Sequence, residues 1–233
     1  MYESKAFLNV LCEGHTEEEF VKHVLRPYLQ PFNITTRYQL LETSHKKNSR
    51  GGLLSYQQAS GDLTLWIKQV AHRASEIHYF TTMFDLYALP NDFPQYEEAQ
   101  KIHDTYTKVE KLETAFKEKI DYERFIPYIQ IHEFEALLFC GIEQLAQKYN
   151  ACAKDIRKLE YAVKEYKGNP EMINGGKSTA PSKRIINTIE KTYHYNKPQT
   201  GWEITAQIGI TKLKERCRHF SEWIEKLEDL GQN

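Results

Sequence analysis

The sequence predicts an α/β fold, with a mostly parallel sheet covered by helices on both faces. Short apolar segments alternate with helical patterns through the first 140 residues, and strands that alternate with helices form parallel sheets of this kind. After about residue 141 the strand patterns disappear, and glycines and prolines divide the remaining sequence into helices. We therefore predict an α/β core at residues 1–140 and a helical C-terminal extension, packed on that core, at residues 141–233.

Four segments are predicted to form the sheet. Each is short, rich in apolar or β-branched residues and bounded by turn residues, as expected of buried strands. In chain order these segments are residues 6–12, 35–41, 77–84 and 126–131. Ligands of open α/β sheets bind beyond the carboxyl ends of the strands, so the residues that follow these segments are candidates for a functional site.

The segments between the strands carry helical patterns. Thr16 and Glu19 fit a capping box with the threonine as N-cap, and the apolar residues behind them recur on one helical face. Residues 63–74 predict a second helix. Residues 95–119 mix acidic residues and lysines at helical spacing, which predicts one long solvated helix.

The composition excludes several classes of protein. The chain has 31 Lys and Arg against 32 Asp and Glu, a net charge of -1, so any contact with nucleic acid needs a local basic patch. The four cysteines form no CxxC pair, which favours thiols in a reducing compartment over zinc ligands or disulfides. No apolar run approaches the roughly 18 residues of a membrane helix, and the N-terminus lacks a secretory signal pattern. We expect a soluble, cytoplasmic protein.

Acidic residues follow three of the predicted strands. Glu13 follows the first strand and precedes Gly14, Asp85 ends the third, and Glu133 and Glu135 follow the last. Carboxylates are hard oxygen ligands that suit Mg²⁺ or Mn²⁺. Several of them at one sheet edge would repel one another unless a cation or a shared proton relieved them. The sequence therefore predicts a Mg²⁺ (or Mn²⁺) site at this edge.

Each acidic residue has a structural alternative. Glu17, four residues after Glu13, could face the same crevice or simply favour the positive end of the helix dipole. Asp85 could be a turn-forming aspartate. Glu133 and Glu135 share a face if the segment is extended, point about 200° apart if it is helical, and could equally be first-turn acids of a helix. A charged Glu13 is the hardest to explain structurally, because it risks burial without a partner.

Two basic segments could contact phosphate. Lys46, Lys47 and Arg50 lie in a loop that also contains glycines, which would let the backbone approach a phosphate while the cations neutralise it. Lys183 and Arg184 could stabilise a phosphorane-like transition state. For both segments the alternative is an ordinary solvated surface charge.

Two familiar motifs are excluded. His132 and Glu133 lack the second histidine of a zinc-protease motif, because Ala136 stands in its place. Residues 176–179 read GKST, but the glycine and the strand that precede this sequence in an ATP-binding loop are missing.

Four segments resemble known proteins. LCEGHTEEEF, at residues 11–20, resembles the opening motif of Toprim domains, which occur in topoisomerases, bacterial primases, recombination mediators and nucleases of the overcoming-lysogenization-defect (OLD) class. MFDLYALPNDFP (residues 83–94), PYIQIHEFEALLF (residues 127–139) and TAPSKRI (residues 179–185) resemble a small bacterial Toprim-like family of unknown function. Members of that family are often encoded beside an ABC-type ATPase in phage-defence loci.

The resemblance implies a Toprim-like fold in which Glu13 is the invariant-type glutamate and Asp85 the first acid of the Asp-x-Asp motif. It also implies that Glu17, one turn beyond the glutamate, binds metal as in the nuclease branch. Tyr87 stands where the second aspartate is expected, which removes a ligand and puts a two-metal mechanism in doubt. The candidates to replace that ligand are Asp92, Glu133 and Glu135.

Together, the residues and the resemblance predict a divalent-metal-dependent nuclease, or a related phosphodiester-processing subunit, in an anti-phage system. Glu13, Asp85 and Glu17 would hold the metal, with Lys183 as a catalytic cation. The residues expected to contact phosphate are Lys46, Lys47, Arg50, Lys183 and Arg184. The partners implied are nucleic acid, with DNA favoured over RNA, and an ABC-type ATPase, and a homo-oligomer is compatible with both. The alternatives are a non-catalytic Toprim-like module that binds nucleic acid or the ATPase, and a nucleotide-binding α/β protein.

Overall fold

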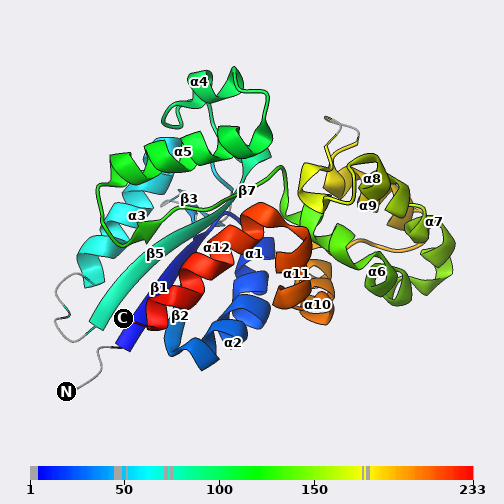
Figure 1. The fold of residues 1–233 in the computed structure, drawn as a ribbon, viewed down its shortest axis with the longest axis horizontal. Helices are drawn as coiled ribbons and strands as arrows, with labels where there is room; N and C mark the ends of the chain where they lie inside the picture. Colours follow the sequence, from blue (N-terminus) through cyan, green and yellow to red (C-terminus); the bar gives the residue numbers. More distant parts are fainter. Residues whose placement is uncertain are drawn as a thin grey trace.

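The computed structural model describes residues 5–44, 49–50, 52–70, 73, 76–174, 176 and 179–232. Its centre is a five-stranded parallel sheet in the order β2-β1-β5-β6, with β7 also beside β5 (Figure 1). The strands are β1 (Lys5–Cys12), β2 (Ile34–Leu40), β5 (Glu76–Asp85), β6 (Phe125–Ile126) and β7 (Ile129–Gln130). The predicted α/β class with a mostly parallel sheet is confirmed.

Helices cover both faces of the sheet (Figure 1). Leu8 and Val10 of β1 pack in one apolar cluster with residues of α1 (His15–Phe20) and α12 (Arg218–Glu228), whereas Leu11 packs with α3 (Tyr56–Val70) and α5 (Thr105–Ile120) in the other. This division follows from the alternation of strand side chains between the two faces. No described helix has the length and apolar character needed to cross a membrane.

The remaining elements connect and extend these layers. A π-helical turn (Val21–Leu25), α2 (Arg26–Leu29) and the 3-10 turn Gln30–Phe32 continue α1, and β3 (Glu42–Ser44) pairs with β4 (Ser49–Arg50) in a separate antiparallel hairpin. Further along the chain lie η3 (Leu86–Ala88), α4 (Tyr96–Gln100), η4 (Phe134–Gly141), α6 (Ile142–Lys148), η5 (Asn150–Cys152), α7 (Ala153–Arg157), α8 (Glu160–Glu165), η6 (Pro170–Met172), α9 (Pro181–Ile189), α10 (Lys197–Ile208), α11 (Ile210–Arg216) and η7 (Asp229–Gly231), where η marks 3-10 helices.

The last predicted strand is divided into β6 and β7. Pro127 has no backbone N–H to donate to a neighbouring strand, and the next residue bonds a side chain instead. The N–H of Tyr128 donates to Thr82 Oγ1 at 3.0 Å, and the Thr82 hydroxyl donates to the carbonyl of Tyr128 at 3.0 Å. Thr82 of β5 thus replaces the backbone hydrogen bonds that are missing between β6 and β7.

The predicted N-cap of the first helix is wrong by two residues. The helix begins at His15, its N-cap is Gly14, and Thr16 is buried inside the first turn. Glu17 Oε2 accepts a hydrogen bond from the Gly14 N–H at 2.9 Å. Three consecutive glutamates offered several residues for the third helical position, and Glu17 rather than Glu19 occupies it.

Two other predicted helices have different bounds. α3 begins at Tyr56 rather than residue 63, because Ser55 Oγ accepts from the N–H of Gln58 at 3.1 Å and Asp92 accepts from the N–H of Tyr56. The long helix predicted at residues 95–119 is instead the pair α4 and α5. The second of these begins after an aspartate N-cap, Asp104, whose Oδ2 accepts from the N–H of Thr107 at 2.8 Å.

The C-terminal helices divide between two places. In Figure 1, α6 to α9 extend away from the sheet at the right, whereas α10, α11 and α12 return beside α1. Trp223 of α12 donates from Nε1 to Thr81 Oγ1 of β5 at 2.9 Å and stacks on Tyr128, with ring centroids 4.1 Å apart. The predicted boundary at residue 140 stays a prediction.

Gly201 lets α10 approach α1 and η4 closely. A Cβ at this position would lie 2.9 Å from Phe134 Cε1 and 3.0 Å from Thr16 Cγ2. We expect Gly201→Ala to lower the free energy of unfolding by about 1–3 kcal/mol, because the added methyl overpacks this contact. The control is Gly61→Ala in α3, where a Cβ would meet nothing within 4 Å. Denaturant unfolding curves that show both variants at least as stable as the wild type would contradict this expectation.

Candidate active site

Four carboxylates gather at the carboxyl ends of β1 and β5, and we refer to them as the acid cluster. Its members are Glu13 after β1, Glu17 in the first turn of α1, Asp85 at the end of β5 and Glu135 in η4. Burial raises the pKa of Asp85 well above its ordinary value, and the charges of the other three raise it further. The sheet therefore brings together acids that the sequence placed at three separate positions.

Backbone N–H groups hold three of these carboxylates in place. Glu13 Oε2 accepts from the N–H of Asp85, Glu17 Oε2 from that of Gly14, and Asp85 Oδ1 from that of Phe134, each at 2.9 Å. The second oxygens of Glu13 and Asp85 accept no hydrogen bond from any residue that the structure describes. Each of these two side chains is therefore fixed by one oxygen and has the other available for a ligand.

Glu135 is the most deeply buried member of the acid cluster. Its side chain is 0% exposed, and neither carboxylate oxygen has a hydrogen-bond partner. Lys197 Nζ lies 3.1 Å from Oε2, in a direction that makes the contact an ion pair rather than a hydrogen bond. Burial raises the pKa of Glu135 to about 7, although the positive charge of Lys197 opposes this rise.

Lys197 is the first residue of α10 and faces the acid cluster. Burial lowers its pKa, but the charges of Glu135, Asp85 and Glu17 outweigh burial and raise the pKa above the ordinary lysine value. Its side chain is 40% exposed, and its ammonium group contacts Glu135. Lys197 therefore carries a permanent positive charge next to four carboxylates.

The acids of the cluster hold protons more tightly than isolated carboxyl groups do. Burial raises the pKa of Glu13 to about 7, with a further contribution from Glu17, while the N–H of Asp85 and Lys197 oppose the shift. Burial likewise raises the pKa of Glu17. Protons or a cation would relieve this repulsion near neutral pH.

The donor set suits a hard divalent cation, although the side chains are not arranged around one. Within the described part of the chain, no three His, Cys, Asp or Glu side chains form a ready-made metal site. The acid cluster nevertheless supplies only oxygen donors, as Mg²⁺ and Mn²⁺ prefer. Three of its members are anchored by backbone N–H groups, and all four repel one another, so these residues fit a cation in chemistry and charge.

Two predicted acidic residues instead hold the starts of helices. Glu133 Oε2 accepts from the N–H of Ser182 at 2.9 Å, in the first turn of α9, and Asp92 Oδ1 accepts from the N–H of Tyr56 at 2.9 Å. Glu133 has extended backbone and Glu135 lies in the 3-10 helix η4. The two glutamates therefore have different roles, and only Glu135 belongs to the acid cluster.

Of the predicted basic residues, the structure describes the side chains of Lys183 and Arg184, and neither forms a described ion pair with the acid cluster. Lys183 is exposed on α9, and Arg184 donates from Nε to the carbonyl of Thr179 at 2.6 Å. Lys46 and Lys47 lie outside the described residues, as does the side chain of Arg50. The cation that the structure does place among the acids, Lys197, was missed by the sequence analysis.

His132 was also missed as a feature of this region. It has φ 61, a left-handed conformation that is uncommon for residues other than glycine. Its side chain is buried, and Nδ1 has no hydrogen-bond partner. Burial, assisted by the charge of Lys108, lowers the pKa of His132 to about 4, so the imidazole is neutral at neutral pH.

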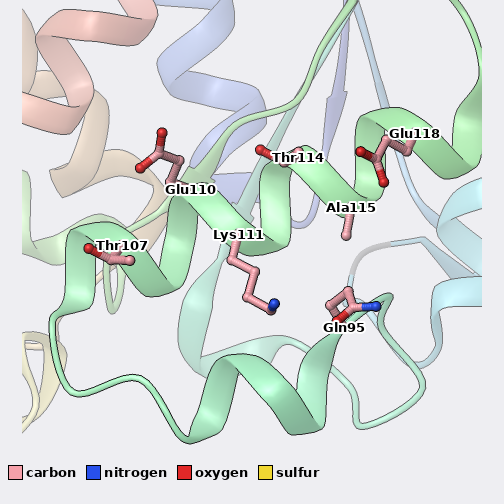
Figure 2. Close-up of a pocket in the computed structure, with 7 residues that line it drawn as sticks. All are labelled: Gln95, Thr107, Glu110, Lys111, Thr114, Ala115 and Glu118. Carbon is pink, nitrogen blue, oxygen red and sulfur yellow. The ribbon is translucent and has the colours of Figure 1, made fainter.

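A surface hollow of about 440 Å³ lies between α5 and the turn before α4 (Figure 2). Lys111 extends across it toward Gln95. The residues that line it are Gln95, Thr107, Glu110, Lys111, Thr114, Ala115 and Glu118. None of them belongs to the acid cluster, so we assign the chemistry to the acid cluster rather than to this hollow.

Comparison with known proteins gives a family. No curated protein and no solved structure matches the chain. The sequence profile of a domain of unknown function, DUF4276, matches residues 12–228. This range is most of the chain and includes the acid cluster and Lys197, so the chain belongs to the DUF4276 family.

Proposed function

We propose that this chain is a divalent-metal-dependent phosphodiester hydrolase, a nuclease whose catalytic centre is the acid cluster. The observation that carries the proposal is the convergence of four mutually repelling carboxylates, three of them buried and Glu13 half-buried, at the carboxyl ends of two parallel strands. Such a cluster costs stability in the metal-free protein, and perturbed pKa values of this kind gather at functional sites. The carboxyl edge of a parallel sheet is also where α/β proteins bind their ligands.

The residues of the acid cluster have separate roles in this proposal. Glu13, Asp85 and Glu17 would hold Mg²⁺ or Mn²⁺. A bound divalent cation polarises a phosphate and lowers the pKa of an attacking water. Glu135 fixes the ammonium group of Lys197, and Lys197 in turn favours the ionised forms of the other acids, which ligands to a cation must adopt.

The choice of substrate and partner rests on the resemblance to Toprim-like proteins. Residues 11–20, 83–94, 127–139 and 179–185 carry that resemblance. It supports nucleic acid as the substrate, with DNA favoured, and a separate ABC-type ATPase as the partner in a phage-defence system. It also supports a Toprim-like arrangement of the sheet and of Glu13 and Asp85.

A reducing, cytoplasmic location is part of the same proposal. All four cysteines are buried and free. Cys140 and Cys217 approach within 3.4 Å between their sulfur atoms without being bonded. Close, unbonded thiols are expected where the compartment keeps cysteines reduced.

The proposal is tested by a cleavage assay. The purified chain is incubated with supercoiled plasmid, linear duplex, single-stranded DNA and RNA, in Mg²⁺, Mn²⁺ or a chelator. We expect cleavage that requires the metal and falls by about 100-fold or more in Glu13→Gln, which keeps the shape of the side chain but removes its charge. The matched control is Glu18→Gln, an acid on α1 outside the acid cluster, which should cleave like the wild type.

Two outcomes would reject the nuclease assignment. Cleavage that persists in the chelator or in Glu13→Gln would place the activity outside the acid cluster. Absence of cleavage by the chain, alone and with an ABC-type ATPase of the proposed kind, combined with metal-independent binding of nucleic acid, would establish the non-catalytic module.

A further inference from the structure

A large aromatic side chain lies exposed next to the acid cluster. Tyr87 is two residues beyond Asp85, in the 3-10 turn η3, and is 43% exposed. Leu54 is also exposed, at 68%, in the segment that follows Gly52, and the N–H of Gly52 donates to the carbonyl of Glu13 at 2.6 Å. The carboxyl edge of the sheet therefore has apolar surface beside its carboxylates.

The ring of Tyr87 is supported by the buried residue His132. Its backbone N–H donates to the carbonyl of His132 at 3.1 Å, and the two rings have centroids 5.2 Å apart at an interplanar angle of 44°. His132 is buried and held in a left-handed backbone conformation. A ring supported in this way loses little conformational entropy when a flat ligand stacks on it.

The surroundings of Tyr87 favour stacking over ion pairing as the source of affinity. The described charges of the acid cluster are four carboxylates and the ammonium group of Lys197. A phosphate next to the acid cluster is repelled by its carboxylates, and an attraction that does not depend on charge offsets this repulsion. Stacking of a base on an aromatic ring supplies such an interaction and tolerates any base sequence.

We propose that Tyr87 is a base-stacking platform, and that the substrate of the site is single-stranded or locally unpaired nucleic acid. This inference rests on the proposed function and specifies its substrate class. The physical reason is that both faces of an internal base in a duplex are covered by its neighbours, whereas an unpaired base can turn a face to a side chain. Tyr87 lies two positions after Asp85, at most about 7 Å along the chain. A base on the ring and its phosphate near the acid cluster can therefore belong to one nucleotide or to adjacent ones.

Equilibrium binding measures this directly. Fluorescently labelled single-stranded DNA, RNA of the same sequence and a duplex hairpin are titrated by anisotropy, in a chelator and in Ca²⁺. We expect the single strands to bind more tightly than the hairpin. Tyr87→Ala should weaken single-strand binding by about 5- to 150-fold, with little change for the hairpin. Tyr87→Phe, which keeps the ring, should bind like the wild type.

Two controls separate stacking from a change in fold. Tyr161→Ala removes a tyrosine that is 71% exposed on α8, away from the strand ends in Figure 1, and should leave binding unchanged. A series of single strands, each lacking one base, tests the contact without altering the protein. One abasic position should weaken binding to the wild type as much as Tyr87→Ala does, and should have no further effect in that variant.

Several results would overturn the inference. Tighter binding of the hairpin, equal losses in Tyr87→Ala and Tyr87→Phe, or no oligonucleotide binding in either buffer would each do so. The outcome is distinguishable from failure of the proposed function, because binding is measured without cleavage. Metal-dependent cleavage with no effect of Tyr87→Ala would reject only the stacking platform. Stacking without any cleavage would reject only the nuclease.

Discussion

Replacing Lys197 by methionine is expected to shift the pH profile of cleavage to higher pH and to destabilise the metal-free protein near neutral pH. The charge of Lys197 lowers the pKa values of all four members of the acid cluster. Without this charge the acids take up protons at a higher pH, and protonated acids do not hold a cation. Cleavage near pH 7 should fall by about tenfold for each unit by which the limiting pKa rises.

The expected loss of stability comes from Glu135. Removing one partner of a buried ion pair costs about 3–5 kcal/mol, because the other charge is left buried without compensation. Glu135 is fully buried but the Lys197 side chain is 40% exposed, so solvent already screens part of the interaction and we expect about 2–3 kcal/mol. The double variant Lys197→Met with Glu135→Gln should recover most of this loss, since the buried charge is gone.

The shape of the pH profile distinguishes this role from a merely structural one. If Lys197 acts by keeping the acids ionised, cleavage by Lys197→Met recovers at alkaline pH, and Lys197→Arg stays close to the wild type. If Lys197 only holds α10 in place, cleavage falls equally at every pH. Lys148→Met is the matched control. Lys148, on α6, forms an ion pair with Glu203 of α10, the helix that also carries Lys197, and 24% of each side chain is exposed. Neither residue belongs to the acid cluster.

The carboxylates of the site could be predicted because their positions depend on local sequence. Glu13 and Asp85 end two apolar strands, and parallel neighbouring strands carry such residues to one edge. Glu17 was predicted at the start of the helix that follows Glu13, where a role at the helix dipole stayed the alternative. The positions of Glu13 and Asp85 needed only the strand pattern.

Lys197 could not be predicted in the same way. Asn196 and Pro198 mark the start of a helix, but nothing in that segment shows which part of the sheet the helix contacts. Its place depends on the packing of Gly201 against Phe134 and Thr16, a contact between segments far apart in the sequence. The separate roles of Glu133 and Glu135 depend on a change from extended to 3-10 backbone, which the hydrophobic pattern does not encode.

The metal-free protein is expected to carry a destabilising contribution from Glu135 that grows as the pH rises. Burial raises the pKa of this carboxyl from 4.5 to about 7, so the folded state binds the proton more tightly than the unfolded chain does. The stability that this proton contributes is fully present below pH 4.5 and is lost as the pH rises through about 7. A shift of this size corresponds to about 3 kcal/mol, or several degrees in Tm.

The pH-dependent contribution of Glu135 to the free energy of unfolding must be isolated from that of His132, which changes with pH in the opposite direction. Because the pKa of His132 is lowered from 6.5 to about 4, its contribution to stability is present above pH 6.5 and is lost as the pH falls toward 4. The informative quantity is therefore the difference in unfolding free energy between the wild type and Glu135→Gln across this range. The variant should gain relative to the wild type as the pH rises, whereas Glu118→Gln, at an exposed position on α5, should not. A constant difference would contradict the burial of an ionisable Glu135.

Mg²⁺ or Mn²⁺ should reverse this loss, and the pH dependence of that reversal identifies the acid cluster as the binding site. Near pH 5 the carboxyl groups of Glu13 and Glu135, whose pKa values are raised to about 7, are protonated and compete with the cation. Near pH 8 these two groups are ionised and repel one another, so the cation should raise Tm much more at the higher pH. Exposed acids such as Asp104 and Glu98 have lowered pKa values because hydrogen bonds favour their ionised forms. A cation held only by such surface groups would stabilise the protein about equally at both pH values, and equally in Glu13→Gln. Thermal unfolding of the wild type and of that variant, with and without the metal, therefore separates the two kinds of site even before any substrate is known.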